Sequence, residues 1–257
     1  MPAVKTSMLS CNLDKIALLR NSRDGFGPDP LVAASICIAN GAGGLTLHPR
    51  ADLRHALFSD LRDFSRLTRQ NPGIELNIEG DLRPDLIGLI HELEPEQFTV
   101  VPVDRGEKTS SRGWRDGDDQ KGLVEFIKSK STKTRVSVFV DASLDSVTRA
   151  IDAGASSVEF YTGDFALAEA RLSREPRSRE LQSAFDHQCQ RLRTAAELAR
   201  KQGARINAGH DLTLMNLGFL VRLIHPDEVS IGHSLIADAL VYGLAETVQK
   251  YCQQLRA

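Results

Sequence analysis

The sequence lacks the marks of several protein classes. Its four cysteines form no CxxC pair and show no zinc-ligand spacing, so we expect reduced thiols in a cytoplasmic protein. No apolar run approaches the ~18 residues of a membrane span, and the first residues lack the apolar core of a signal peptide. The formal net charge of −2 gives no global reason to expect nucleic-acid binding. No HExxH-type cluster stands out, so we expect no metal.

The chain does contain a regular alternation of short apolar segments and helical segments. The apolar segments predict eight strands, at 8–13, 44–48, 74–79, 97–102, 135–140, 156–160, 204–207 and 228–231. The segments between them predict helices at 28–39, 59–69, from 84, at 120–130, from 143, at 179–202, from 213 and at 234–255.

This alternation is typical of parallel βαβ units, and short strands rich in valine and isoleucine suit a parallel sheet covered on both faces. With 257 residues, 41% of them hydrophobic, the chain can build one sizeable core, and α/β barrels reach this length as one domain. The sequence therefore predicts an α/β fold, a (β/α)8 TIM barrel that occupies residues 1–257. A doubly wound open sheet is the main alternative, weakened because no GxGxxG follows the first strand.

One long polar loop interrupts the pattern at 103–119. A long loop at the mouth of a barrel is often a lid that closes over the substrate, and we expect one here. A disordered, solvated insert is the alternative.

Polar side chains follow several of the predicted strands, at the end where a barrel builds its active site. His48 ends the second strand two residues before Arg50, so both side chains can face one ligand. The imidazole could act as acid or base, and the guanidinium could bind a phosphate. Glu79 and Glu159 end the third and sixth strands, where partial desolvation would raise a carboxyl pKa toward general-base values. An internal salt bridge is the alternative for each glutamate.

The first, seventh and eighth strands end in similar clusters. Gly232 and His233 precede a helix, whose free N–H groups are a ready anion site. Asn207 to His210 supplies the neighbouring loop, and barrels often bind phosphate after strands seven and eight. Residues 12–15, together with Arg20, either bind the substrate or form hydrogen bonds within the loop. Spacing alone thus predicts an enzyme acting on a small phosphorylated compound.

Seven short motifs lie in order along nearly the whole chain, from about residue 8 to 255. They are NLDKIALLR at 12–20, TLHPRADLRH at 46–55, LNIE at 76–79, VP at 101–102 with 105–109 beyond, VEFYTG at 158–163, NAGH at 207–210 and IGH at 231–233. In this order they resemble the pyridoxine 5′-phosphate synthase family, and together they are far more specific than any one motif. That family is a (β/α)8 barrel, in agreement with the element count.

The resemblance implies a ring-forming condensation. The family joins 3-amino-2-oxopropyl phosphate and 1-deoxy-D-xylulose 5-phosphate into pyridoxine 5′-phosphate, releasing phosphate and water, with no redox cofactor and no metal. By motif, His48 and Glu79 would accept protons, His210 would donate one, and Glu159 would stabilise charge in a transition state. The residues that would hold the substrates are Asn12, Asp14, Lys15, Arg20, Arg50, His55, Thr109, Asp211, Gly232 and His233. The family assembles as an octamer, so a homo-octamer is expected.

The chain departs from the family pattern at several substrate-holding positions. Lys15 and Tyr161 stand where the family usually has histidine, and Asp211 stands where it has glycine. Pro49 and Ala51 replace the usual leucine and glutamate beside the second-strand arginine. The four proton-handling residues are all present. Two alternatives therefore stay open: a divergent barrel enzyme acting on another phosphorylated carbonyl compound, and a non-catalytic phosphometabolite-binding protein.

Overall fold

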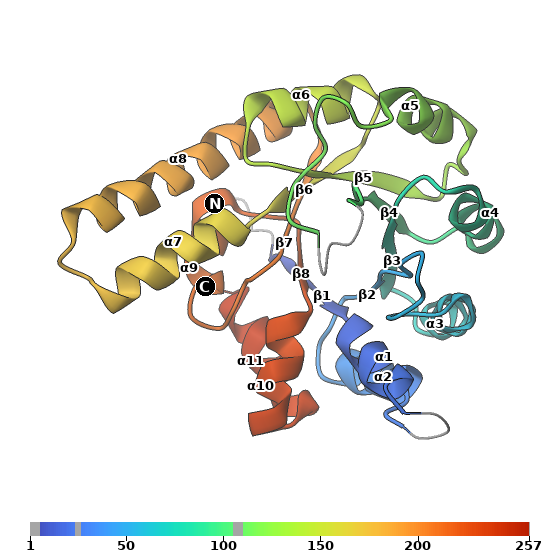
Figure 1. Cartoon of the computed structure of the whole chain (residues 1–257). Helices are drawn as coiled ribbons and strands as arrows, with labels where there is room; N and C mark the ends of the chain where they lie inside the picture. The colour runs from blue at the N-terminus through green and yellow to red at the C-terminus, as the bar shows by residue number, and fades with distance from the viewer. Residues whose placement is uncertain (1–5, 24–26, 105–109, 257) are drawn as a thin grey trace.

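The computed structural model describes residues 6–23, 27–104 and 110–256, and its strands close into a barrel. The strands are β1 (Met8–Asn12), β2 (Gly44–Leu47), β3 (Glu75–Gly80), β4 (Gln97–Val100), β5 (Arg135–Val140), β6 (Ser157–Tyr161), β7 (Arg205–Gly209) and β8 (Glu228–Ile231). All neighbouring pairs are parallel, and β1 pairs with β8 (Figure 1). The predicted α/β TIM barrel is confirmed, and the open sheet is wrong. The expectation of one domain over residues 1–257 stays a prediction.

Helices surround the barrel between consecutive strands (Figure 1). They are α1 (Asp14–Asn21), α2 (Pro30–Ala39), α3 (Phe58–Gln70), α4 (Pro84–Leu93), α5 (Gln120–Ser129), α6 (Leu144–Asp152), α7 (Gly163–Arg174), α8 (Arg179–Lys201), α9 (Leu217–Ile224), α10 (His233–Tyr242) and α11 (Leu244–Gln254). In the described part of the chain, none of these helices combines the length and apolar character that crossing a membrane requires.

Local capping explains where the predicted helices begin. Asp29 accepts a hydrogen bond from the N–H of Leu31 at 2.8 Å, with Pro30 at the first helical position of α2. Ser143 caps α6 and Ser178 caps α8 in the same way.

Three helical features differ from the sequence prediction. Helices α1 and α7 were not predicted, because each follows its strand almost directly and starts without a side-chain cap. The segment 234–255, expected as one helix, is broken into α10 and α11 at Gly243, whose φ of +79° lies in the left-handed region that favours glycine.

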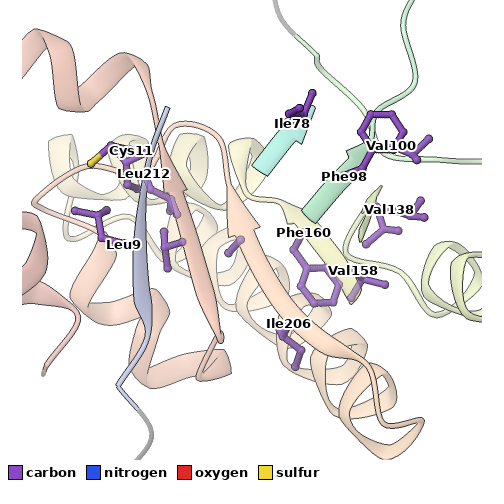
Figure 2. Packing of buried hydrophobic residues seen from close by; sticks show 14 of the residues in the cluster. Leu9, Cys11, Ile78, Phe98, Val100, Val138, Val158, Phe160, Ile206 and Leu212 are labelled. Atoms are coloured by element: carbon purple, nitrogen blue, oxygen red, sulfur yellow. The ribbon is translucent and has the colours of Figure 1, made fainter. Parts of the chain in front are cut away.

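The apolar core lies between the strands and the surrounding helices. Alternate strand residues point outward into it, among them Phe98, Val138, Val158, Phe160 and Ile206, each fully or almost fully buried (Figure 2). The residues between them point into the barrel, and there the side chains are largely polar.

Hydrogen bonds tie this polar interior together. The hydroxyls of Ser10 and Thr46 lie 2.7 Å apart, and the Thr99 hydroxyl donates to Oδ1 of Asn77 at 2.9 Å. Nε2 of Gln97 donates to Oε2 of Glu228 at 3.2 Å. Because each of these groups is buried and bonded, the barrel can hold polar side chains directly beneath the residues at its rim.

Candidate active site at the C-terminal rim of the barrel

A cavity of about 330 Å³ opens where the strands end. Twelve of the fourteen residues predicted for the site line it. These twelve are Asn12, Asp14, Lys15, His48, Arg50, His55, Glu79, Glu159, His210, Asp211, Gly232 and His233. Side chains separated by more than two hundred positions in the sequence thus face one space small enough for a single substrate complex.

Of the other two predicted residues, only Arg20 falls within the described part of the chain, and it does not line the cavity. Arg20, on α1, forms a bidentate ion pair with Asp60 of α3, with N–O distances of 2.6 and 2.8 Å. Thr109 falls outside the described residues, as does the middle of the expected lid, 105–109.

The described flanks of the 103–119 loop are held in place. The guanidinium of Arg112 donates to Asp104 at 2.8 Å and to Asp118 at 2.7 Å, and these carboxylates raise its pKa. Ser110 is buried and lines the cavity, and its hydroxyl accepts a hydrogen bond from Arg50 at 3.4 Å. Sequence reasoning missed Ser110, since a lone serine in a polar loop gives no signal. Closure of the loop stays a prediction.

His48 and Glu79 form a buried pair, with Nδ1 of His48 3.7 Å from Oε2 of Glu79. Burial lowers the pKa of His48, and the charge of Arg50 lowers it further. Burial also raises the pKa of Glu79, helped by the charge of Glu159. Among the described residues Nε2 of His48 has no hydrogen-bond partner. A neutral imidazole with one open nitrogen is suited to accepting a proton from a substrate.

Asp14 organises the neighbouring wall. Its carboxylate accepts the backbone N–H of His48 at 2.9 Å, while Oδ1 of Asn12 accepts the N–H of Asp14 at 3.0 Å. Burial raises the pKa of Asp14 to about 7, against the lowering effect of the bond from His48. Burial lowers the pKa of His55 to about 4, and the nearby charges of Lys15 and Arg50 act in the same direction.

His210 is packed among aromatic rings. Its ring centroid lies 5.0 Å from that of Phe139 and 5.6 Å from that of Tyr161. The hydroxyl of Thr162 donates to the carbonyls of Gly209 and His210, which fixes the turn that follows β7. Burial lowers the pKa of His210 to about 4, although the charge of Asp211 raises it.

The backbone of this turn explains one departure from the family pattern. His210 and Asp211 have φ values of +78° and +56°, in the left-handed region. Aspartate is among the residues that tolerate this region, whereas glycine occupies it without cost. Glycine would therefore fit position 211 with the least backbone strain. Asp211 adds a carboxyl group there while the backbone keeps the same left-handed conformation.

Glu159 lies against the backbone of β7. A Cβ at Gly209 would come within 2.5 Å of Oε1 of Glu159, so glycine leaves the space that this carboxyl occupies. Burial raises the pKa of Glu159 to about 8, and the charge of Glu228 contributes.

The opposite wall offers cationic and N–H groups. Gly232 precedes the first residue of α10, His233, so the helix N-terminus faces the cavity with its free backbone N–H groups. A Cβ at Gly232 would lie 3.3 Å from the side chain of Asn12, which shows how closely β1 and the β8 turn approach. Arg50 and Lys15 add positive charge. In the described part of the chain, no group of His, Cys, Asp or Glu side chains could hold a metal ion.

The fold and the site define a TIM-barrel enzyme with buried imidazole and carboxyl groups and a helix N-terminus at the carboxyl ends of its strands. The family model of the pyridoxal phosphate biosynthesis protein PdxJ matches residues 9–257. The chain belongs to this family, which confirms the resemblance stated from the motifs.

Relatives of similar length share much of the sequence. Pyridoxine 5′-phosphate synthase from Xanthomonas axonopodis pv. citri is 42% identical over 261 residues, covering 98% of both chains. The protein of the same name from Bacteroides thetaiotaomicron is 42% identical over 254 residues, covering 96% of this chain and 99% of its own.

Solved structures with little sequence identity share the fold. The 3-hexulose-6-phosphate synthase from Salmonella typhimurium has a TM-score of 0.62 at 16% identity, covering 97% of this chain and 98% of its own. A phosphoribosyl anthranilate isomerase has a TM-score of 0.57 at 11% identity, covering 97% of this chain and 98% of its own. At this identity the likeness concerns the barrel and not the reaction.

Proposed function

We propose that this protein is a pyridoxine 5′-phosphate synthase. It condenses 3-amino-2-oxopropyl phosphate with 1-deoxy-D-xylulose 5-phosphate and releases pyridoxine 5′-phosphate, phosphate and water. The observation that carries the proposal is the meeting of His48, Glu79, Glu159 and His210 in one cavity, in a chain about 42% identical to synthases of this name.

The buried groups support a division of proton transfers. Imine formation, loss of water and ring closure each move a proton at a defined place. In our proposal, His48 and Glu79 act as a coupled pair that accepts protons, because the imidazole is held neutral and lies 3.7 Å from the carboxyl. His210 donates a proton on the other side of the cavity, and Glu159 stabilises charge in the transition state.

Two phosphates require two places where anions are stabilised. We assign one to the N-terminus of α10 at Gly232 and His233, where helix N–H groups face the cavity. We assign the other to Arg50, which follows β2, together with Lys15, which follows β1. Asn12, Asp14 and His55 then contact the carbonyl and hydroxyl groups between the phosphates. No cofactor is needed for these steps.

The charged side chain of Asp211 favours one alternative. It lines the cavity as an exposed carboxylate, which would repel a phosphate placed against the β7 turn. A divergent enzyme acting on another phosphorylated carbonyl compound is therefore the second candidate. Replacing Asp211 by glycine separates the two, because a strong rise in turnover of the family substrates would indicate that the natural substrate differs.

We also propose a cytoplasmic homo-oligomer, with an octamer as the expected state. Leu240 and Val241 on α10 are 83% and 75% exposed, and Tyr242 lines a shallow apolar groove with Val32 of α2. Such a patch is larger than isolated exposed apolar residues would give and suits burial in an assembly. Light scattering on the purified protein measures the assembly state directly. The four cysteines are free thiols, as a reducing compartment favours.

The function is tested by incubating the purified protein with both substrates and measuring pyridoxine 5′-phosphate together with released phosphate. A His210→Asn variant is the matched control, since asparagine tolerates the left-handed φ of +78° at this position and has no imidazole. Product formed by the natural sequence and lost in the variant is the expected result. Equal product in both, or none in either, would contradict the proposal. Tight binding of phosphorylated ligands without turnover would point instead to a binding protein.

A further inference from the structure

The polar interior beneath the cavity contains a chain of hydrogen bonds. Arg135, at one end of it, fixes which groups donate and which accept. The guanidinium of Arg135 has five N–H donors and no acceptor, so it can only donate. Its Nε donates to Oε1 of Gln97 at 3.0 Å, so the amide oxygen of Gln97 must face Arg135. The amide nitrogen of Gln97 accordingly faces the other way and donates to Glu228.

The same oxygen of Gln97 fixes the orientation of Asn207. Nδ2 of Asn207 donates to Oε1 of Gln97 at 3.0 Å. Rotating the Asn207 amide would bring two acceptors together, because Gln97 cannot turn without setting its N–H groups against Arg135. The oxygen Oδ1 of Asn207 is therefore left as an acceptor, and among the described residues it has no donor.

Asn207 lies beside Glu159. The two residues are paired in register on β6 and β7, and Glu228 follows in the same row on β8. All three are at most 2% exposed, and neighbouring strands are about 4.8 Å apart. Oε2 of Glu159 also has no hydrogen-bond partner in the described part of the chain. Two buried acceptors on adjacent, inward-pointing side chains thus lack the one donor that would satisfy both.

We propose that Glu159 is a carboxylic acid in the resting protein, that its O–H donates to Oδ1 of Asn207, and that Asn207 is thereby a positioning residue for an acid in the active site. One proton satisfies both oxygens, whereas an ionised Glu159 would leave two buried acceptors without a donor.

The electrostatic surroundings agree with this assignment. Burial raises the pKa of Glu159 to about 8, and the charge of Glu228 raises it further, while contact with the Thr99 hydroxyl lowers it. Glu79 is a third carboxyl, whose pKa is raised by burial and further by the charge of Glu159. Three carboxyl groups in one buried space cannot all ionise together. A proton therefore remains on Glu159, which has an acceptor beside it in Asn207.

The assignment defines what Glu159 does in the reaction. A neutral acid that donates to Asn207 at rest can turn to a substrate oxygen and stabilise negative charge there by hydrogen bonding, or hand over its proton to a leaving hydroxyl. This catalytic part rests on the proposed function. The protonation state and the role of Asn207 do not.

Infrared spectroscopy measures the protonation state without turnover. The difference spectrum between the natural sequence and Glu159→Gln, recorded at pH 6.5 with 13C-labelled glutamate for assignment, should contain the C=O stretch of a protonated carboxyl. Asn207→Leu should shift that band to higher frequency, because the O–H loses its acceptor. Thr247→Val removes a buried hydroxyl on α11, outside the barrel interior, at the same size, and it should leave the band in place.

Two results would overturn the proposal. Carboxylate bands alone at pH 6.5 would mean that Glu159 is ionised, and an unmoved band in Asn207→Leu would remove Asn207 from the argument. If the leucine variant does not fold, Asn207→Ala provides the same comparison with a smaller side chain that also lacks an acceptor. In turnover, Asn207→Leu should lower kcat about tenfold or more with KM changed by less than about threefold. If the protein makes no product at all, the infrared result still decides the protonation state.

Discussion

Replacing Gly209 by alanine should disable the site while leaving the barrel folded. The added Cβ would lie 2.5 Å from Oε1 of Glu159, whereas ordinary contact begins near 3.4 Å, so the carboxyl must retreat by about 0.9 Å. The φ angle of Gly209 is outside the left-handed region, so the backbone itself accepts alanine. A misplacement of about 1 Å in an active site costs on the order of 100-fold in rate, and overpacking costs about 1–3 kcal/mol of stability.

The assay is steady-state formation of pyridoxine 5′-phosphate, with urea unfolding measured on the same preparations. Gly88→Ala is the matched control, because Gly88 lies inside α4 and an added Cβ there meets nothing within 4 Å. That change should stabilise the protein by about 0.5–1 kcal/mol and leave turnover as it was.

A double variant isolates the clash. Glu159→Asp shortens the side chain, so Gly209→Ala should cost less stability in its presence than alone, and the two effects should not add. Unchanged turnover in Gly209→Ala, or strictly additive stability effects, would refute the reasoning.

Three further results are expected from the buried titratable groups. Burial raises the pKa of Glu228 from 4.5 to about 7, so between these values the folded protein holds a proton that the unfolded chain has released. This group's contribution to stability therefore falls by about 3 kcal/mol as the pH rises through that range. Glu228→Gln should flatten the fall seen in urea unfolding, and an identical pH profile for both proteins would contradict this. Tyr161→Ala should move the pKa of His210 from about 4 toward 6.5 in an NMR titration, whereas Tyr161→Phe, which keeps the ring, should leave it in place. Asp14→Ala should lower the free energy of unfolding by about 1–3 kcal/mol, because the buried N–H of His48 loses its acceptor; an unchanged melting curve would argue against that bond.

The sequence by itself determined the class of fold and most of the site. Strand and helix alternation predicted the barrel, because hydrophobic periodicity and turn residues are local properties. The clusters at strand ends, such as His48 with Arg50, predicted which side chains meet, since all parallel strands of a barrel end at one rim.

Tertiary structure alone decided the rest. It placed Arg20 in an ion pair with Asp60, forty residues away, and brought Ser110 into the cavity. It also made the barrel interior polar, with Asn207 pointed by Gln97. Protonation states and amide orientations depend on which groups share a buried space, and that depends on register between strands far apart in the chain. No local pattern of residues contains this information.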